Sequence, residues 1–212
     1  MDILSPQIND FLTNLVPPRP PEVQKMEAYA EQHDFPIIGP ICGHLCYQLA
    51  RLLGARRVFE MGSGYGYSTA WFAQAVKENG GGEVHHVVWD EKLSLLARGH
   101  LTALGYQGLV KYTVGEAIQA LQVAEGSFDL IFMDIDKQDY PKAIPTIYGK
   151  LRVGGLLIID NILWSGRIFD PKDQSAATQA IRETTGVLAS TDKWLTSIIP
   201  LRDGLLLATK QA

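Results

Sequence analysis

The sequence has 212 residues, which is enough for one large globular domain with a sizeable buried core. Hydrophobic residues make up 46% of the chain and charged residues 20%, as is ordinary for a soluble protein. The net charge of −4 gives no general attraction to nucleic acid or anionic lipid. A membrane-spanning helix needs about 18 consecutive apolar residues, and no run in the sequence is that long. We therefore predict a cytoplasmic protein without membrane association.

The first 54 residues show helical patterns separated by prolines. Ser5 can cap a helix that reaches Val16, a second helix is expected over residues 22–34, and a third over residues 40–53. We predict that residues 1–54 form a helical cap on an α/β core of residues 55–212, the two parts making one domain.

From Arg57 onward, strand-like and helix-like segments alternate, which is typical of a parallel sheet with helices on both faces. Near the C-terminus, two strand-like runs are separated only by Arg202 and Asp203, and so short a link predicts an antiparallel hairpin. The expected fold is a Rossmann-like, doubly wound α/β sheet of seven strands, mostly parallel. The predicted strands cover residues 56–61, 82–89, 109–114, 128–134, 154–160, 193–201 and 204–210, with helices at 68–78, 91–104, 140–151 and about 173–185.

A glycine-rich loop, EMGSGYGYS at residues 60–68, follows the first predicted strand. Its glycines let a ligand approach the backbone, and the helix that follows offers free N–H groups. The spacing departs from the dinucleotide fingerprint, and Glu60 would repel a pyrophosphate. An acid suits a cofactor with an ammonium, a sulfonium and ribose hydroxyls, so S-adenosylmethionine fits better than NAD. A glycine turn without a ligand is the alternative.

Polar side chains also end two predicted strands. Asp134 ends one, and Asp160 with Asn161 ends the next, so three oxygen ligands could meet at the edge that carries the glycine loop. Such a set suits a divalent cation, Mg²⁺ or also Mn²⁺ or Ca²⁺, although these residues could instead cap helices or turns. Lys137 lies close enough to overhang the site as a general base, and the alternative is a solvated surface lysine.

Three segments together resemble the cation-dependent class I O-methyltransferases, which include caffeoyl-CoA and catechol O-methyltransferases and many bacterial relatives. The segments are VFEMGSGYGYSTA, FDLIFMDIDKQDY and LLIIDNILWSGRI, and the resemblance runs from about residue 37 to residue 210. It implies a homodimer, S-adenosylmethionine as cofactor, a metal held by Asp134, Asp160 and Asn161, and Lys137 as the base. The residues implied at the cofactor are Ile38, Glu60, Gly62, Ser63, Gly64, Ser68, Glu116, Ala117 and Asp134.

Two positions depart from the family pattern. Val88 stands where the family has an acid for the ribose hydroxyls, and Asp90, two residues later, is the candidate replacement. Ser197 matches the glutamate with which catechol O-methyltransferase orients its substrate, which favours the caffeoyl-CoA-like and bacterial branch.

The resemblance implies methyl transfer to a vicinal dihydroxy aromatic small molecule, a phenolic acceptor chelated by the metal. Trp164 could form a wall over the acceptor ring or only pack its loop against the body. Three alternatives stay open: a methyltransferase of a hydroxylated tRNA base, an NAD-dependent oxidoreductase, and a non-catalytic cofactor-binding protein.

Overall fold

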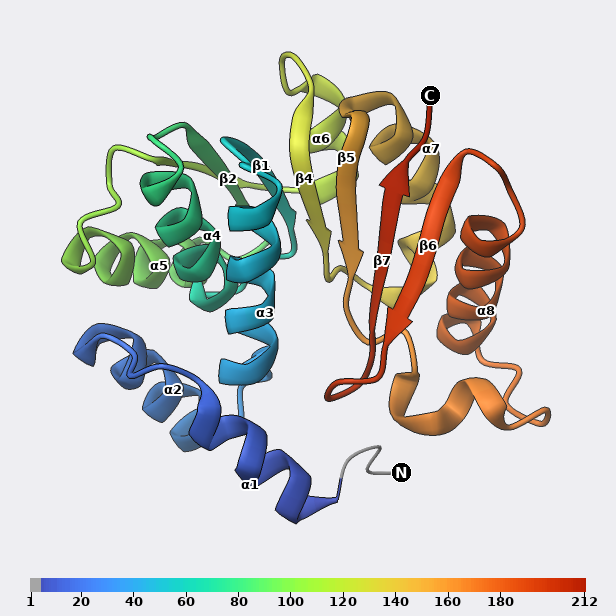
Figure 1. Ribbon diagram of the computed structural model, residues 1–212, viewed down its shortest axis with the longest axis horizontal. Helices are drawn as coiled ribbons and strands as arrows, with labels where there is room; N and C mark the ends of the chain where they lie inside the picture. The colour runs from blue at the N-terminus through green and yellow to red at the C-terminus, as the bar shows by residue number, and fades with distance from the viewer. Residues whose placement is uncertain (1–4) are drawn as a thin grey trace.

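The structure is a computed structural model that describes residues 5–212, so the first four residues of the predicted cap lie outside it. A seven-stranded sheet crosses the molecule between two groups of helices (Figure 1). The strands are β1 (Arg57–Met61), β2 (Glu83–Val88), β3 (Val110–Val114), β4 (Phe128–Met133), β5 (Leu151–Ile159), β6 (Trp194–Ile199) and β7 (Leu205–Lys210). The α-helices are α1 (Pro6–Leu15), α2 (Pro21–His33), α3 (Gly39–Leu52), α4 (Tyr67–Glu78), α5 (Glu91–Ala103), α6 (Ala117–Val123), α7 (Tyr140–Lys150) and α8 (Ala176–Ala189), with short 3-10 turns η1 (Lys137–Asp139) and η2 (Trp164–Phe169).

The strand order is β3-β2-β1-β4-β5-β7-β6. Strands β1 to β5 pair in parallel, whereas β7 runs antiparallel to both β5 and β6. This arrangement confirms the predicted Rossmann-like sheet with its C-terminal hairpin. The order reverses between β1 and β4, and ligands of such sheets bind beyond the carboxyl ends of the strands at that switch point.

Alternating side chains of each central strand enter two separate cores. Val58 and Leu130 pack on the side of α3, α4 and α5, whereas Phe59, Ile131 and Met133 pack on the side of α6, α7 and α8. Successive side chains of a strand point to opposite faces, so a sheet covered on both sides needs nearly continuous apolar strands. The apolar run of each strand ends where the helices no longer cover the sheet, and the first polar residue of the chain follows at that edge.

The N-terminal helices form close to the predicted limits. Ser5 caps α1 by accepting a hydrogen bond from the Ile8 amide at 3.4 Å. Helix α3 packs along α4 so closely that a Cβ at Gly43 would overlap the Trp71 indole. Within residues 5–212, no helix has the length and apolar character needed to cross a bilayer.

Several predicted boundaries differ from the structure. Strand β5 begins at Leu151 rather than at residue 154, and helix α6 was not predicted. The hairpin link is wider than two residues, because β6 ends at Ile199 and β7 begins at Leu205. The last helix begins at Ala176 rather than near residue 173, because the Asp173 carboxylate accepts hydrogen bonds from the Ser175 amide and hydroxyl and forms a turn there. The wider link, residues 200–204, lies beside the carboxyl end of β5.

Candidate active site

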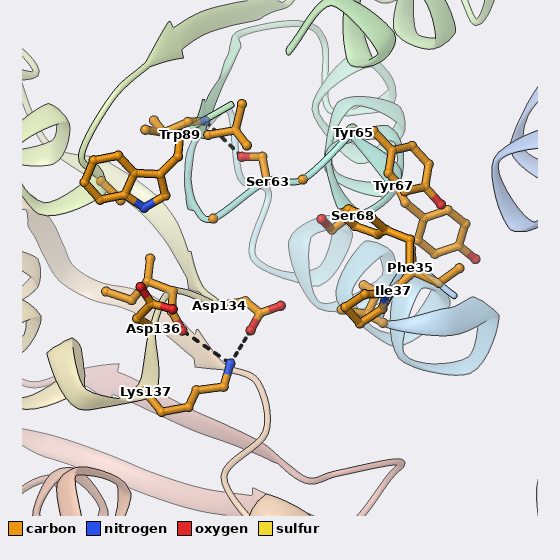
Figure 2. A pocket seen from close by; sticks show the side chains of 18 of the residues that line it. Phe35, Ile37, Ser63, Tyr65, Tyr67, Ser68, Trp89, Asp134, Asp136 and Lys137 are labelled. Carbon is orange, nitrogen blue, oxygen red and sulfur yellow. Dashed lines mark hydrogen bonds and ion pairs between the residues drawn. The ribbon is translucent and has the colours of Figure 1, made fainter. Parts of the chain in front are cut away.

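A cavity of about 320 Å³ opens at the carboxyl ends of β1, β2 and β4, at the switch point of the sheet. We call it the first cavity. Figure 2 shows Ser68 and Phe35 at one end, Trp89 at the other, and Asp134 and Lys137 along one side. Its lining also includes Ile37, Ile38, Gly62, Ser63, Gly64, Tyr65, Tyr67, Val87, Val88, Gly115, Ala117, Ile135 and Asp136.

The glycine loop is built by backbone conformations that a side chain would disturb. Gly62 has a φ of +86°, and a Cβ there would overlap the backbone carbonyl of Asp134. Glycine at this position therefore lets β1 and β4 approach where the cavity begins. Ser63 then fastens the loop to β2, since its hydroxyl accepts a hydrogen bond from the Val87 amide at 2.9 Å. Ser68 lies buried in the first turn of α4 and faces the cavity, as Figure 2 shows.

Glu60 lies beneath the loop and is not part of the cavity wall. Its Oε2 accepts a hydrogen bond from the Thr69 hydroxyl, which also contacts His86 Nδ1 at 3.0 Å, whereas Oε1 has no partner among the described residues. Burial raises the pKa of Glu60 to about 7, although nearby hydroxyls act in the opposite direction. The predicted cofactor acid is therefore a fully buried group behind the wall.

At the opposite end, the backbone and apolar side chains form the wall. Val88, Trp89 and Ala117 line the cavity, but the predicted ligands Asp90 and Glu116 do not. Asp90 caps α5 by accepting from the Lys92 and Leu93 amides at 2.6 and 3.2 Å, and the Glu116 carboxylate caps α6 in the same way. The sequence therefore located this end by Ala117 but overlooked Trp89, whose signal was its position directly after a buried strand.

Asp134 and Lys137 form a close pair on the cavity wall. Lys137 Nζ donates hydrogen bonds to Asp134 Oδ1 at 2.5 Å and to the Ile135 carbonyl at 3.3 Å. The Lys137 side chain is only 12% exposed, so it is not a solvated surface lysine. Its amine lies at the boundary between two spaces, because a second cavity of about 350 Å³ is lined by Ile135, Asp136, Lys137, Gln138, Trp164 and Ala177.

Trp164 borders this second cavity. It has a left-handed backbone with φ of +49°, and the Arg167 guanidinium carbon lies 5.3 Å from the centre of its ring. Its indole Nε1 is buried without a partner among residues 5–212. The structure thus places Trp164 both against the apolar core and beside the space next to Lys137.

Asp160 is the residue whose surroundings differ most from expectation. It is fully buried, and Arg202 Nη1 donates to its Oδ2 at 3.0 Å and to its Oδ1 at 3.3 Å. Burial raises the pKa of Asp160 to about 6, with Arg202 acting against that shift and Asp134 adding to it. Asn161, the third expected metal ligand, donates from Nδ2 to Asp203 Oδ2 at 3.1 Å.

These residues do not fit a divalent cation in the observed arrangement. A magnesium or calcium ion needs carboxylate oxygens whose charge is free to face it. Both oxygens of Asp160 face a guanidinium, and Oδ1 also accepts from the Asn161 amide at 2.8 Å. The sequence brought Asp134 and Asp160 to one edge correctly, but it missed Arg202.

Fold and cavity define the class: a Rossmann-like α/β protein whose ligand cavity lies at the switch point of the sheet and holds a buried lysine on its wall. The chain belongs to the O-methyltransferase family, whose sequence model matches residues 23–211.

Individual relatives agree with this assignment. A catechol O-methyltransferase of Niastella koreensis is 29% identical over 157 residues, which cover 72% of this chain and 70% of that protein. The crystal structure of the O-methyltransferase TomG from Streptomyces achromogenes, in complex with SAM, superposes with a TM-score of 0.87 at 26% identity and covers 97% of this chain and 96% of TomG. A methyltransferase from Geobacter sulfurreducens superposes over 100% of both chains, with a TM-score of 0.84 and 26% identity.

Proposed function

We propose that this protein transfers a methyl group from S-adenosylmethionine to a phenolic hydroxyl of a small aromatic acceptor. Family membership supports O-methyl transfer, and the SAM in TomG supports the choice of methyl donor. The observation that carries the assignment of sites is the position of Lys137. It is a largely buried amine that borders both the first and the second cavity.

The residues of the first cavity fit this methyl donor. Gly62 and Gly64 leave the loop backbone open to a ligand, and Ser68 offers a hydroxyl at the start of α4. The Asp134 carboxylate on the cavity wall supplies negative charge for a cationic ligand. Trp89, Val88 and Ala117 provide an apolar surface for an adenine at the other end. Neither Asp90 nor Glu116 lines that end, so the ribose depends on other groups of the wall, including the backbone.

S-adenosylmethionine supplies a methyl group on a sulfonium centre, which becomes a neutral thioether once the acceptor oxygen has taken the methyl. In its neutral amine form, Lys137 Nζ accepts the proton that the acceptor hydroxyl loses, and the Asp134 carboxylate stabilises the resulting ammonium. The partial burial of both groups strengthens that charge interaction relative to water. Chelation of the acceptor by Mg²⁺, which the sequence suggested, has no part in this proposal because Arg202 faces both oxygens of Asp160.

The second cavity is the place for the acceptor. Its volume of about 350 Å³ suits a single aromatic ring with short substituents, and the Trp164 side chain lines it. The catechol O-methyltransferase among the relatives supports a catechol-type acceptor, whose second oxygen lies next to the attacking one.

Two measurements test the proposal. Calorimetry should detect binding of S-adenosylhomocysteine but not of NAD, and the reverse result would overturn the choice of cofactor. A screen with labelled methyl donor should then transfer label to a catechol, caffeoyl-CoA or a flavonoid. Label found only in undermodified, hydroxylated tRNA would refute a small-molecule acceptor.

A matched pair of tryptophan variants assigns the two cavities. Trp164→Ala should raise the KM for the acceptor and leave the affinity for S-adenosylhomocysteine unchanged, since Trp164 lines the second cavity only. Trp89→Ala should do the opposite, since Trp89 lines the first. If both variants changed the same constant, the assignment of the cavities to two ligands would be wrong.

A further inference from the structure

The link between β6 and β7 is fastened to the loop after β5, and this attachment fixes the position of Arg202. The amides of Ile162 and Leu163 donate to the carbonyls of Gly204 and Asp203 at 3.1 and 2.9 Å. The Asp203 carboxylate in turn accepts from Asn161 Nδ2 at 3.1 Å. These contacts hold the backbone of Arg202 beside Asp160, so its side chain does not extend from a mobile loop.

Arg202 also adopts an uncommon backbone conformation. Its φ is +50°, in the left-handed region that glycine and asparagine enter most easily. An arginine is held there at some energetic cost, and in that conformation its guanidinium reaches a carboxylate whose side chain is only 1% exposed.

Only part of the hydrogen-bonding capacity of Arg202 is used. A guanidinium has five N–H donors in a planar fork, and the contacts to Asp160 involve Nη1 alone. The side chain keeps 32% exposure, so a ligand at the rim of the sheet can reach it. Such a fork binds two neighbouring oxygens of a planar group more readily than a single one.

We propose that Arg202 takes the place of the divalent cation: its guanidinium neutralises Asp160 and offers its remaining N–H groups to two adjacent oxygens of the acceptor. The acceptor class is then an aromatic ring with a hydroxyl next to a second hydroxyl, a carbonyl or a carboxylate. The assignment of an acceptor rests on the proposed function, whereas the replacement of the cation by Arg202 stands on the contacts with Asp160.

Binding of Mn²⁺ to the full-length protein with saturating S-adenosylhomocysteine tests the replacement without any turnover. The wild type should bind Mn²⁺ with a Kd weaker than about 1 mM, the weak end for protein divalent-ion sites. Arg202→Ala should tighten binding by at least about tenfold, because Asp160 then faces the ion with an uncompensated charge. Adding Asp160→Asn to Arg202→Ala should abolish that gain. Submillimolar, stoichiometric binding by the wild type would overturn the proposal.

A control separates local charge from net charge. Arg152→Ala removes an arginine that is paired with Asp129 at 2.7 Å, away from both cavities, and should leave Mn²⁺ binding at the wild-type level. If Arg152→Ala and Arg202→Ala tightened Mn²⁺ binding equally, the effect would come from net charge, and the specific role of Arg202 would be refuted. Affinity for S-adenosylhomocysteine shows whether Arg202→Ala is folded. If it is not, Arg202→Lys replaces it, with a smaller gain expected because it keeps the charge.

Kinetics supply the second readout. EDTA should leave methyl transfer by the wild type unchanged, and Arg202→Lys should raise the KM for the acceptor more than it lowers kcat, because a lysine lacks the fork. Loss of wild-type transfer in EDTA, restored by Mg²⁺, would overturn the proposal. If no acceptor were methylated at all, the proposed function would fail, while the Mn²⁺ measurements would still decide the role of Arg202.

Discussion

Two regions at the carboxyl edge of the sheet, the first cavity and the Asp160–Arg202 pair, are built in different ways. The first consists mainly of the glycine loop and the ends of β1 and β2, so backbone conformation within a short segment sets its shape. The second region is the pair of Asp160 and Arg202, which are 42 residues apart and meet because the β6–β7 link packs on the loop after β5. A short motif can therefore define a ligand cradle, whereas the charge at the adjoining site depends on a distant partner.

The largest expected effect is at the boundary between the cavities. Lys137→Met should lower kcat by about 10²–10⁴-fold, the usual contribution of a general base, and leave the affinity for S-adenosylhomocysteine nearly unchanged. Lys142→Met is the matched control, because Lys142 pairs with Asp139 at the surface and borders neither cavity. Steady-state kinetics and calorimetry measure both variants. Loss of cofactor affinity in Lys137→Met would assign Lys137 to the first cavity only.

A pair of glycine variants tests whether backbone shape governs the first cavity. Gly62 and Gly80 both have positive φ, +86° and +94°, but only at Gly62 would a Cβ overlap other atoms. Both alanine variants should lose about 1–2 kcal/mol of stability from the left-handed conformation. Gly62→Ala alone should also lose affinity for S-adenosylhomocysteine, by up to about 10²-fold, as the loop shifts. Equal affinities by calorimetry would show that the loop does not touch the cofactor.

The buried groups behind the first cavity predict opposite pH effects on stability. Burial, with a smaller contribution from Arg98, lowers the pKa of His86 from 6.5 to about 3. Between these two pH values the unfolded chain binds more protons than the folded chain, so the free energy of unfolding rises with pH. Burial raises the pKa of Glu60 from 4.5 to about 7, so its contribution to stability falls as pH rises in that range.

Urea unfolding in the window they share, between 4.5 and 6.5, separates the two groups. His86→Gln should make stability fall more with rising pH than in the wild type, and Glu60→Gln should make it rise more. The affinity of each folded variant for S-adenosylhomocysteine serves as the control for local packing. Slopes that shift in the same direction would contradict these assignments.

The smallest expected effect concerns Asp90. Asp90→Ala should cost about 1 kcal/mol of stability, the usual contribution of a helix N-cap, and leave the affinity for S-adenosylhomocysteine unchanged. Glu116→Ala, which removes the cap of α6, should behave alike. A drop in affinity with Asp90→Ala alone would restore Asp90 as a ligand of the ribose.

The fold was predictable because the strands are buried on both faces and read as apolar runs, such as residues 128–133 and 156–159. The hairpin link was predicted too short because Pro200 and Leu201 continue the apolar pattern beyond the last pairing residue, Ile199. Asp90 and Glu116 were assigned to the cofactor from the family resemblance, and in the structure their carboxylates cap α5 and α6. Sequence does not distinguish a carboxylate that binds a ligand from one that caps a helix.

The sequence by itself determined the sheet, the glycine loop and the meeting of Asp134, Lys137 and Asp160 at one edge. These follow from local patterns, since apolar runs end where the sheet ends and parallel strands bring their carboxyl ends together. Only the tertiary structure decided which charges face each other there. Arg202 approaches Asp160 across a link whose position depends on long-range backbone hydrogen bonds, and no spacing in the sequence records that contact.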